Sequence, residues 1–245
     1  MSEAATNLNS NNSDAGPPQL FVGLPSIKDV TTTFKQPDLP VDVLLVTVKN
    51  CEFLACYNEL KDPFRCHFDG LGYVYFADVV GSQPGRVKVA LMKCYEGSTC
   101  PGGSLIAVKN AAPILRPKAV ISVGACSGLN PDKTKLGDVI VSAKLTTYAS
   151  KVVKSDQEQW AGISSYVSRR FLNIIKNCAH GWQPPLKNSN REDHHINVHN
   201  NGEFLSGPEQ IRAESRRKEL LDRHPLATGV EMEGEGERMS LKHSY

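Results

Sequence analysis

The sequence lacks long apolar runs, a strong net charge and the features of a secretion signal, and each absence excludes a class of protein. No apolar run approaches the roughly 20 residues needed to cross a bilayer, so we expect no membrane partner. The 28 Lys and Arg residues nearly balance the 26 Asp and Glu residues, which gives no electrostatic reason to expect nucleic acid as a partner. Residues 1–18 contain no basic segment followed by an apolar core, so they do not predict a signal peptide.

Paired cysteines with metal-binding spacing are also lacking. The seven cysteines are an odd number in a chain without a secretion signal, which favours reduced thiols and a cytoplasmic location. His194, His195 and His199 lie in a polar segment without paired cysteines, and no helix is predicted there to frame a zinc site of the HxxxH type. A solvated histidine-rich loop is therefore the favoured interpretation, and we expect no metal and no cofactor.

The length and the polarity pattern predict one α/β domain after a polar segment. Residues 1–38 are rich in Ser, Asn, Asp, Pro and Thr, and this composition buries too little apolar surface to offset the entropy of ordering. We therefore expect a flexible N-terminal tail there, and a domain over residues 39–245. Within the domain, apolar strands alternate with amphipathic helices, which predicts a sheet with helices on both faces.

Apolar periodicity gives ranges for the individual elements. The expected strands are residues 41–48, 72–80, 86–94, 119–124 and 136–142. The expected helices are residues 51–60, 104–115 and 157–178, with a polar loop over residues 182–201. A further helix is expected to start at residues 206–209, with Ser206 as its N-cap and Pro208 in its first turn, and to end near Arg223.

Two glutamates near the end of the chain suit the binding of a sugar. In residues 230–234 (VEMEG), Glu231 and Glu233 share one face if the strand continues through both of them. A carboxylate has two oxygens, which can accept hydrogen bonds from two vicinal hydroxyls at once. A charged, solvated strand end is the simpler alternative for this motif taken alone.

Two turns rich in small residues are further candidates for ligand binding. Residues 124–128 (GACSG) leave room for a flat base or a sugar to approach the backbone, although a tight turn needs the same glycines without any ligand. Residues 96–103 (EGSTCPGG) lie before a predicted helix, whose N-terminal N–H groups suit a polar ligand. This segment has neither the GK[ST] ending of a P-loop nor a GxGxxG pattern, and a plain Gly/Pro turn is an equal alternative.

Three segments, in this order, resemble motifs of the purine nucleoside phosphorylase and methylthioadenosine/S-adenosylhomocysteine nucleosidase superfamily. They are residues 120–129 (VISVGACSGL), 135–142 (KLGDVIVS) and 230–234 (VEMEG). The resemblance covers residues 41–236 and implies the phosphorylase/hydrolase-like α/β fold, with a mixed central sheet flanked by helices. It also implies a purine nucleoside as the small-molecule partner and a homodimer as the assembly to expect.

The resemblance implies roles for residues of the small turns and of the VEMEG motif. Glu233 would bind the 2′- and 3′-hydroxyls of ribose, and Met232 would pack on the sugar. The base pocket would be lined by Cys126, Ser127 and Gly128. In the Gly-rich loop before the second predicted helix, Ser98 or Thr99 would touch the sugar or the acceptor.

Two more sites follow from the resemblance. Glu52 would orient and deprotonate the attacking water, with an exposed glutamate at a helix start as an equal alternative. Ser206 and Gly207 would open the segment that covers the purine. Gln210 and Ile211 stand where the relatives carry an aromatic side chain on the base, which argues against aromatic stacking in this chain.

The acceptor and the activity follow from departures from the family pattern. Phosphorylases carry an arginine and a serine at the positions of Ser122 and Ala125, and the loss of both favours water over phosphate as the acceptor. The chain ends at Tyr245, before the strand whose aspartate protonates the base, so we expect the last strand and helix to be lacking and the activity to be impaired. The expectation is an N-ribosyl hydrolase in a C-terminally truncated form, with a non-catalytic nucleoside-binding module as the alternative.

Overall fold

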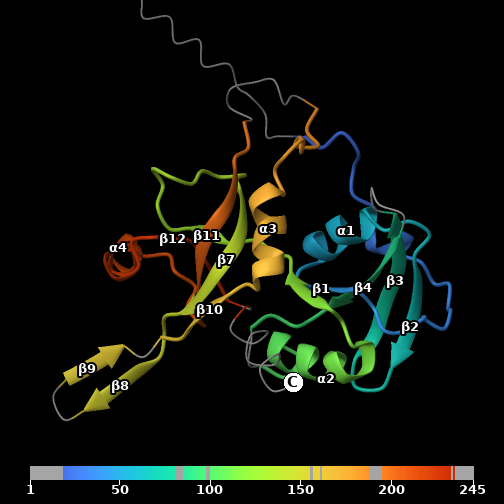
Figure 1. The fold of residues 1–245 in the computed structure, drawn as a ribbon, viewed down its shortest axis with the longest axis horizontal. Helices are drawn as coiled ribbons and strands as arrows, with labels where there is room; N and C mark the ends of the chain where they lie inside the picture. The colour runs from blue at the N-terminus through green and yellow to red at the C-terminus, as the bar shows by residue number, and fades with distance from the viewer. Residues whose placement is uncertain are drawn as a thin grey trace, which may run out of the picture. The chain divides into compact units, whose positions relative to one another are not determined.

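The chain divides into two units by its internal contacts. The computed structural model describes residues 19–80, 85–97, 100–154, 157–160, 162–187, 195–232 and 234. One unit combines residues 1–23 with residues 183–195, and in it Leu20 forms an isolated antiparallel bridge with Leu186. The other unit holds the rest of the chain and all the named helices and strands (Figure 1).

The first sheet of the larger unit has five strands in the order β2-β3-β4-β1-β5. Their bounds are β1 (Val43–Thr47), β2 (Phe64–Phe68), β3 (Gly72–Val80), β4 (Arg86–Lys93) and β5 (Ala119–Ser122). Strand β1 runs parallel to both β4 and β5, whereas β2, β3 and β4 form an antiparallel meander. The sheet is therefore mixed, with β1 in an interior position.

Helices α1 (Asn50–Asn58) and α2 (Ser104–Leu115) pack on different faces of β1. Leu44 and Val46 of β1 belong to the core that contains Val108 of α2. Val43 and Leu45 pack against a separate core that contains residues of α1. Successive side chains of a strand point to opposite faces, so a continuous apolar run is what a strand covered on both sides requires.

The second sheet also has five strands, in the order β10-β7-β11-β12-β6. Their bounds are β6 (Ser127–Gly128), β7 (Val139–Thr147), β10 (Ser164–Tyr166), β11 (Val198–Ser206) and β12 (Ala227–Glu231). Strands β7, β11 and β12 are parallel to one another, and β10 and β6 pair antiparallel at the two edges. The predicted α/β class with mixed strand pairing is confirmed, but the strands form two sheets in place of one central sheet.

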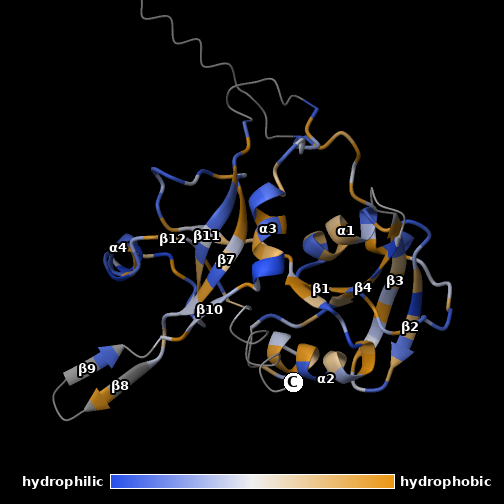
Figure 2. Cartoon of the chain, viewed as in Figure 1, coloured by the Kyte–Doolittle hydropathy of each residue, from blue (hydrophilic) through white to orange (hydrophobic). Residues whose placement is uncertain are grey.

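Helices α3 (Arg169–Asn177) and α4 (Glu214–Arg223) accompany the second sheet. Helix α3 contacts β7 and β11. Helix α4 is largely hydrophilic and contributes the fully buried Leu220 to a core with Leu205 of β11 and Val230 of β12 (Figure 2). Strands β8 (Lys151–Lys154) and β9 (Gln157–Trp160) form a separate antiparallel hairpin.

The predicted helix over residues 157–178 is wrong in its first half. Residues 157–160 and 164–166 are strands, and the helix begins after Ser168, whose hydroxyl accepts a hydrogen bond from the N–H of Phe171. Strand pairing overrides the apolar periodicity, because β10 pairs with β7 and the hydroxyls of Ser164 and Thr146 lie 2.8 Å apart. The apolar residues that suggested one long helix lie partly in the strands and partly in the shorter helix α3.

Two further boundaries differ from the sequence prediction. The predicted loop over residues 182–201 ends early, because β11 begins at Val198 and pairs with β7. The helix expected from Ser206 begins at Glu214, because Ser206 is the last residue of β11 and pairs with Thr147. The Ser-Gly-Pro pattern therefore marks the end of a strand and a turn.

The N-terminal boundary of the domain stays a prediction. Within the larger unit, residues 27–29 form a 3-10 helix, η1 (Ile27–Asp29), and the N–H of Thr31 donates a hydrogen bond of 2.8 Å to the Tyr57 hydroxyl. The expected absence of a last strand and helix concerns the end of the chain, where residues 235–245 lie outside the described part. Within the described residues, no helix combines the length and the apolarity required to cross a membrane.

Candidate functional site

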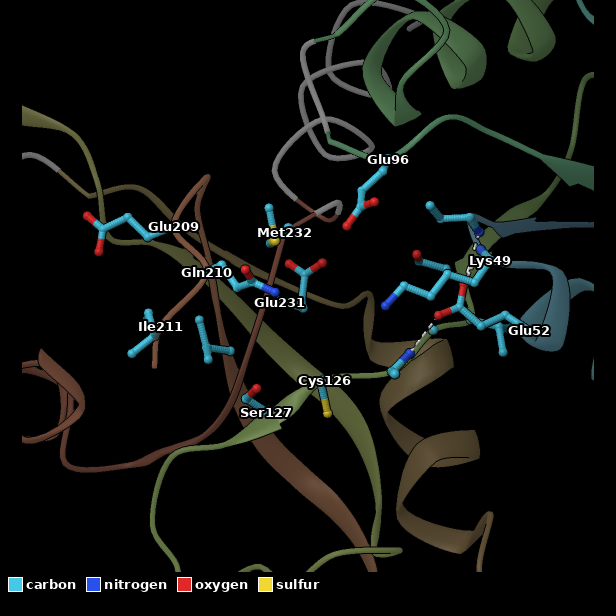
Figure 3. A pocket seen from close by; sticks show the side chains of 16 residues that line it. Lys49, Glu52, Glu96, Cys126, Ser127, Glu209, Gln210, Ile211, Glu231 and Met232 are labelled. Atoms are coloured by element: carbon cyan, nitrogen blue, oxygen red, sulfur yellow. Dashed lines mark hydrogen bonds between the residues drawn. The ribbon is translucent and has the colours of Figure 1, made fainter. Parts of the chain in front are cut away.

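A pocket of about 190 Å³ opens beyond the carboxyl ends of β1 and β5. The turn before β6, the segment between β11 and α4, and the end of β12 complete its walls (Figure 3). The lining residues are Val48, Lys49, Glu52, Glu96, Ser122, Val123, Gly124, Ala125, Cys126, Ser127, Glu209, Gln210, Ile211, Val230, Glu231 and Met232. Ligand sites of open α/β sheets form beyond the carboxyl ends of the strands, so the position suits a small molecule.

Glu52 is held at the wall of this pocket by three backbone N–H groups. It lies in the first turn of α1, and its Oε2 accepts hydrogen bonds from Val48 at 3.1 Å and from Lys49 at 2.8 Å. Its Oε1 accepts a hydrogen bond of 3.0 Å from the N–H of Ala125. These bonds fix the carboxylate and leave about one of its roughly four acceptor positions for a water or a substrate.

Cys126 and Ser127 also line the pocket, directly after Ala125, and their role in binding a base stays a prediction. Cys126 is exposed to the pocket, yet neighbouring atoms partly desolvate its thiol, and this burial together with the Glu231 carboxylate raises the pKa of Cys126. The thiol is therefore neutral at physiological pH. Ser127 begins β6, where it pairs with Val230 of β12.

Gly128 serves the packing of the turn and is not among the described lining residues. It pairs with Gly229 in the antiparallel contact between β6 and β12. A Cβ atom at this position would lie 2.5 Å from Oγ1 of Thr134. The absence of a side chain therefore lets the turn approach Thr134, and its predicted role in the base pocket stays a prediction.

The VEMEG segment brings Glu231 and Met232 to the pocket. Strand β12 ends at Glu231, whose Oε2 accepts a hydrogen bond of 2.8 Å from the N–H of Gly234. Met232 lines the pocket directly after the strand. Glu233, the predicted ribose ligand, lies outside the described residues, and so does Ser98, so both roles stay predictions.

The segment of residues 207–213 supplies the wall that carries Gln210 and Ile211. Glu209 in this segment receives a two-pronged hydrogen bond from Arg216 of α4, with Nε and Nη2 each 2.8 Å from a carboxylate oxygen. The Tyr148 hydroxyl donates to the Glu209 carbonyl at 3.4 Å. Figure 3 shows Glu209 directed away from Gln210, Glu231 and Met232, which is consistent with its pairing outside the pocket.

Ser206 and Gly207 lie beside the pocket and are not among its described lining residues. The carbonyl of Ser206 accepts from the N–H of Tyr148, and the N–H of Gly207 donates to the carbonyl of Glu231. A Cβ atom on Gly207 would lie 2.7 Å from the ring of Tyr148, a residue only 2% exposed. Burial, followed by the nearby Glu209 carboxylate, raises the pKa of Tyr148 to about 12, so it remains a neutral phenol.

The lining is acidic and aliphatic. Four glutamates face one lysine, and one of the glutamates, Glu209, is paired with Arg216. Among the described lining residues there is no arginine, no histidine and no aromatic side chain. Ser122 and Ala125 line the pocket at the positions where the sequence comparison expects arginine and serine in phosphorylases.

Lys49 and Glu209 were not predicted as lining residues, and Glu96 was predicted only as the first residue of the candidate segment 96–103. Each lies in a connection, and only the packing of distant connections against one another places it at the pocket. Figure 3 shows the side chains of Lys49 and Glu96 extending into the pocket.

His199 is not among the described lining residues of the pocket. His199 of β11 lies with its Nε2 2.9 Å from Oδ2 of Asp138, a carboxylate only 2% exposed, and so ties the start of β11 to the start of β7. His194 lies outside the described residues. In the part of the chain that the structure describes, no group of three or more His, Cys, Asp or Glu side chains is arranged to hold a metal ion.

Solved structures with a similar fold include nucleosidases. The 5′-methylthioadenosine/S-adenosylhomocysteine nucleosidase from Neisseria meningitidis in complex with methylthio-immucillin-A has a TM-score of 0.64 at 15% identity, over 84% of this chain and 80% of that chain. The corresponding enzyme from Colwellia psychrerythraea 34H in complex with adenine has a TM-score of 0.58 at 14% identity, over 86% and 78%.

A futalosine hydrolase mutant of Helicobacter pylori strain 26695 is similar as well, with a TM-score of 0.56 at 14% identity over 84% of this chain and 86% of that chain. At these identities the likeness shows the fold. No curated protein matches the sequence. The model of the phosphorylase superfamily matches residues 79–237, which is more than half of the chain. The chain therefore belongs to the phosphorylase superfamily.

Proposed function

We propose that this chain cleaves the N-glycosidic bond of purine nucleosides by hydrolysis. The observation that carries the proposal is the Glu52 carboxylate, fixed at the pocket wall by the N–H groups of Val48, Lys49 and Ala125. A general base must be held within hydrogen-bonding reach of the water that it activates. Two similar solved structures, nucleosidases in complex with methylthio-immucillin-A and with adenine, support a purine ligand.

Water is the proposed acceptor because the pocket is unsuited to a dianion. Phosphate in this space would face Glu52, Glu96 and Glu231. Like charges a few ångströms apart repel strongly in a partly enclosed site. An arginine side chain that donates two parallel hydrogen bonds to phosphate would offset this repulsion, but no arginine is among the described lining residues.

The proposed roles are those that the sequence resemblance implies. Glu52 orients and deprotonates the water, and Cys126 and Ser127 line the base side of the pocket. Glu233 clamps the ribose hydroxyls and Met232 packs on the sugar. Four more residues are proposed to take part in substrate binding: Gly128, Ser98, Ser206 and Gly207. Ser206 and Gly207 would support the segment that covers the purine.

A non-catalytic nucleoside-binding module is the second candidate. The Glu52 carboxylate supports it, because three of its acceptor positions are already occupied by backbone N–H groups. Such a carboxylate is a structural brace between the β1–α1 connection and the turn after β5. A brace of this kind preserves the shape of a nucleoside pocket without requiring turnover.

Base release is the decisive measurement. Adenine or hypoxanthine is quantified from methylthioadenosine, adenosine and inosine, with and without phosphate, using the purified chain. Release that is independent of phosphate and lost in Glu52→Gln supports the hydrolase, provided that Glu59→Gln, an exposed change at the other end of α1, retains it. Thermal stabilisation by nucleoside without any release supports the binding module and rejects the enzyme.

Assembly and location are further parts of the proposal. A homodimer in the cytoplasm is expected from the sequence resemblance and the reduced cysteines. Light scattering on the purified chain tests the first expectation, because a dimer has twice the 26.8 kDa mass of the chain. A monomer at micromolar concentration would reject it.

A further inference from the structure

Gln210 is the one carboxamide side chain among the described residues that line the pocket. Its Oε1 accepts a hydrogen bond of 3.1 Å from Nη2 of Arg212, two residues further along the chain. A guanidinium group only donates hydrogen bonds, so the amide must present its oxygen, and not its nitrogen, to Arg212. The contact with Arg212 therefore decides which way round the amide group of Gln210 lies.

The nitrogen of this amide is available to a ligand. Figure 3 shows it on the side of Gln210 that faces the interior of the pocket. Within the described residues, Nε2 of Gln210 donates no hydrogen bond. An amide nitrogen carries two N–H donors and no acceptor, so the ligand atoms that meet it must be acceptors.

The backbone that carries Gln210 is held in place by contacts of its neighbour. The carboxylate of Glu209 accepts two hydrogen bonds of 2.8 Å from Arg216 of α4, and the Glu209 carbonyl accepts one of 3.4 Å from the Tyr148 hydroxyl. A polar group on a fixed support discriminates between ligands more sharply than a mobile one, because it cannot follow a mismatched ligand. Gln210 is therefore suited to read the pattern of donors and acceptors on a ligand.

The position of Gln210 relative to Glu52 indicates which part of a nucleoside it meets. Gln210 and Ile211 lie on one side of the pocket, and Glu52 lies on the opposite side (Figure 3). A water that a carboxylate activates attacks the sugar from the face opposite to the departing group. With the water at Glu52, the base therefore points toward Gln210, and the aliphatic side chain of Ile211 suits its flat face.

We propose that Gln210 is a specificity-determining residue that selects 6-oxopurine nucleosides over 6-aminopurine nucleosides, with Arg212 as the positioning residue that orients its amide. This inference rests on the proposed function, since it names the substrate class of the same pocket. A 6-oxopurine presents two adjacent acceptors, N7 and O6, whereas adenine presents the N7 acceptor beside the N6 amino donor. The amide pairs with both N6 and N7 of adenine only if its oxygen also faces the base, and Arg212 binds this oxygen.

The test compares base release from inosine and adenosine, which share the same sugar and differ at the N1–C6 edge of the base. It gives kcat/KM for each compound with the wild-type chain and the variants Gln210→Met, Arg212→Met and Gln159→Met. Gln159 is an exposed glutamine of β9 outside the pocket lining and serves as the matched control. We expect the wild-type chain to prefer inosine by about tenfold or more, and Gln210→Met to lose most of this preference through a lower kcat/KM for inosine.

The Arg212→Met variant tests the orientation of the amide. Without Arg212 the amide of Gln210 is free to turn its oxygen toward the base, so kcat/KM should rise for adenosine and not for inosine. A purely structural role of Arg212 would not produce a gain for one substrate. An equal loss for both nucleosides would contradict the positioning role.

The inference fails if the wild-type chain does not prefer inosine, or if Gln210→Met keeps the same preference as the control Gln159→Met. A preference for adenosine that disappears in Gln210→Met would show that the amide presents its oxygen to the base, and would overturn the assignment. If neither nucleoside is cleaved, the hydrolase proposal fails. Dissociation constants of inosine and adenosine from calorimetry, measured with the same variants, then test Gln210 without turnover.

Discussion

The carboxylate of Glu52 accepts a hydrogen bond of 3.0 Å from the N–H of Ala125, a residue 73 positions further along the chain. This bond joins the first turn of α1 to the turn after β5, and the strands that precede them, β1 and β5, are parallel neighbours. A Cβ atom on Gly124 would lie 3.4 Å from the same carboxylate oxygen. The proposed base and the base-facing turn therefore form one structural unit, and changing either one disturbs the other.

Replacing Glu52 by glutamine is expected to reduce both stability and activity. The amide nitrogen of the new side chain would face backbone N–H groups that now donate to a carboxylate oxygen. Losing such charge-assisted bonds should lower the free energy of unfolding by about 1–3 kcal/mol. Urea denaturation measures this loss, and base release from adenosine measures the activity under conditions where the variant is folded.

Glu59→Gln is the matched control for this variant. Glu59 is exposed at the C-terminal end of α1, so the free energy of unfolding should change by less than about 0.5 kcal/mol. If Glu52→Gln proves as stable as this control, the three backbone bonds do not hold the carboxylate in solution.

Gly207→Ala tests whether this glycine serves packing. Its added Cβ atom would lie 2.7 Å from the buried ring of Tyr148, and a ring in a full core has little room to retreat. We expect the free energy of unfolding to fall by about 1–3 kcal/mol in urea denaturation. Gly85→Ala is the control, because nothing lies within 4 Å of its added Cβ atom. Equal stabilities of the two variants would contradict the packing role.

The sequence was sufficient to predict that several pocket residues lie just after the ends of strands. Glu52 and Cys126 come shortly after β1 and β5, and Met232 comes directly after β12. Strand periodicity predicts where such residues leave a sheet, and parallel pairing brings the ends of neighbouring strands to one edge. Of the three motifs, residues 120–129 and 230–234 contribute lining residues, and residues 135–142 contribute none among the described lining residues.

The resemblance pointed to the segment of residues 207–213, but the periodicity of the sequence did not predict its structure. The Ser-Gly-Pro pattern is typical of a helix start, but Ser206 pairs with Thr147 as the last residue of β11, which delays the helix to Glu214. The two hydrogen bonds that Arg216 donates to Glu209 connect α4 to the segment that precedes it. A contact between a connection and a later helix leaves no periodic signal, because it depends on tertiary packing.

Arg216→Lys is expected to loosen the wall that carries Gln210. Lysine cannot reproduce the two parallel bonds of 2.8 Å that Arg216 donates to Glu209, so the segment gains freedom. We expect the KM for adenosine to rise about tenfold, equivalent to about 1.4 kcal/mol of binding, with a smaller change in kcat. Steady-state kinetics separates the two constants.

Arg217→Lys controls for the general effect of this change on α4, because Arg217 is the next residue and lies outside the pocket lining. A KM that stays at the wild-type value in Arg216→Lys would show that the fork does not position the wall. A parallel fall of kcat and thermal stability with an unchanged KM would assign Arg216 to folding alone.

Asp138 is expected to make stability depend on pH. Its burial raises the pKa, but hydrogen bonds from His199 and from the N–H groups of Asn197 and Lys135 outweigh burial and hold the pKa below 3.8. A lowered pKa contributes stability above the unfolded value, and that contribution is lost as the pH falls through the folded value. Asp138→Asn should therefore lower the free energy of unfolding by about 1–3 kcal/mol at pH 7, and by progressively less below pH ~4. Urea denaturation across this range, with the exposed Asp132→Asn as control, would contradict the assignment if the deficit stayed constant with pH.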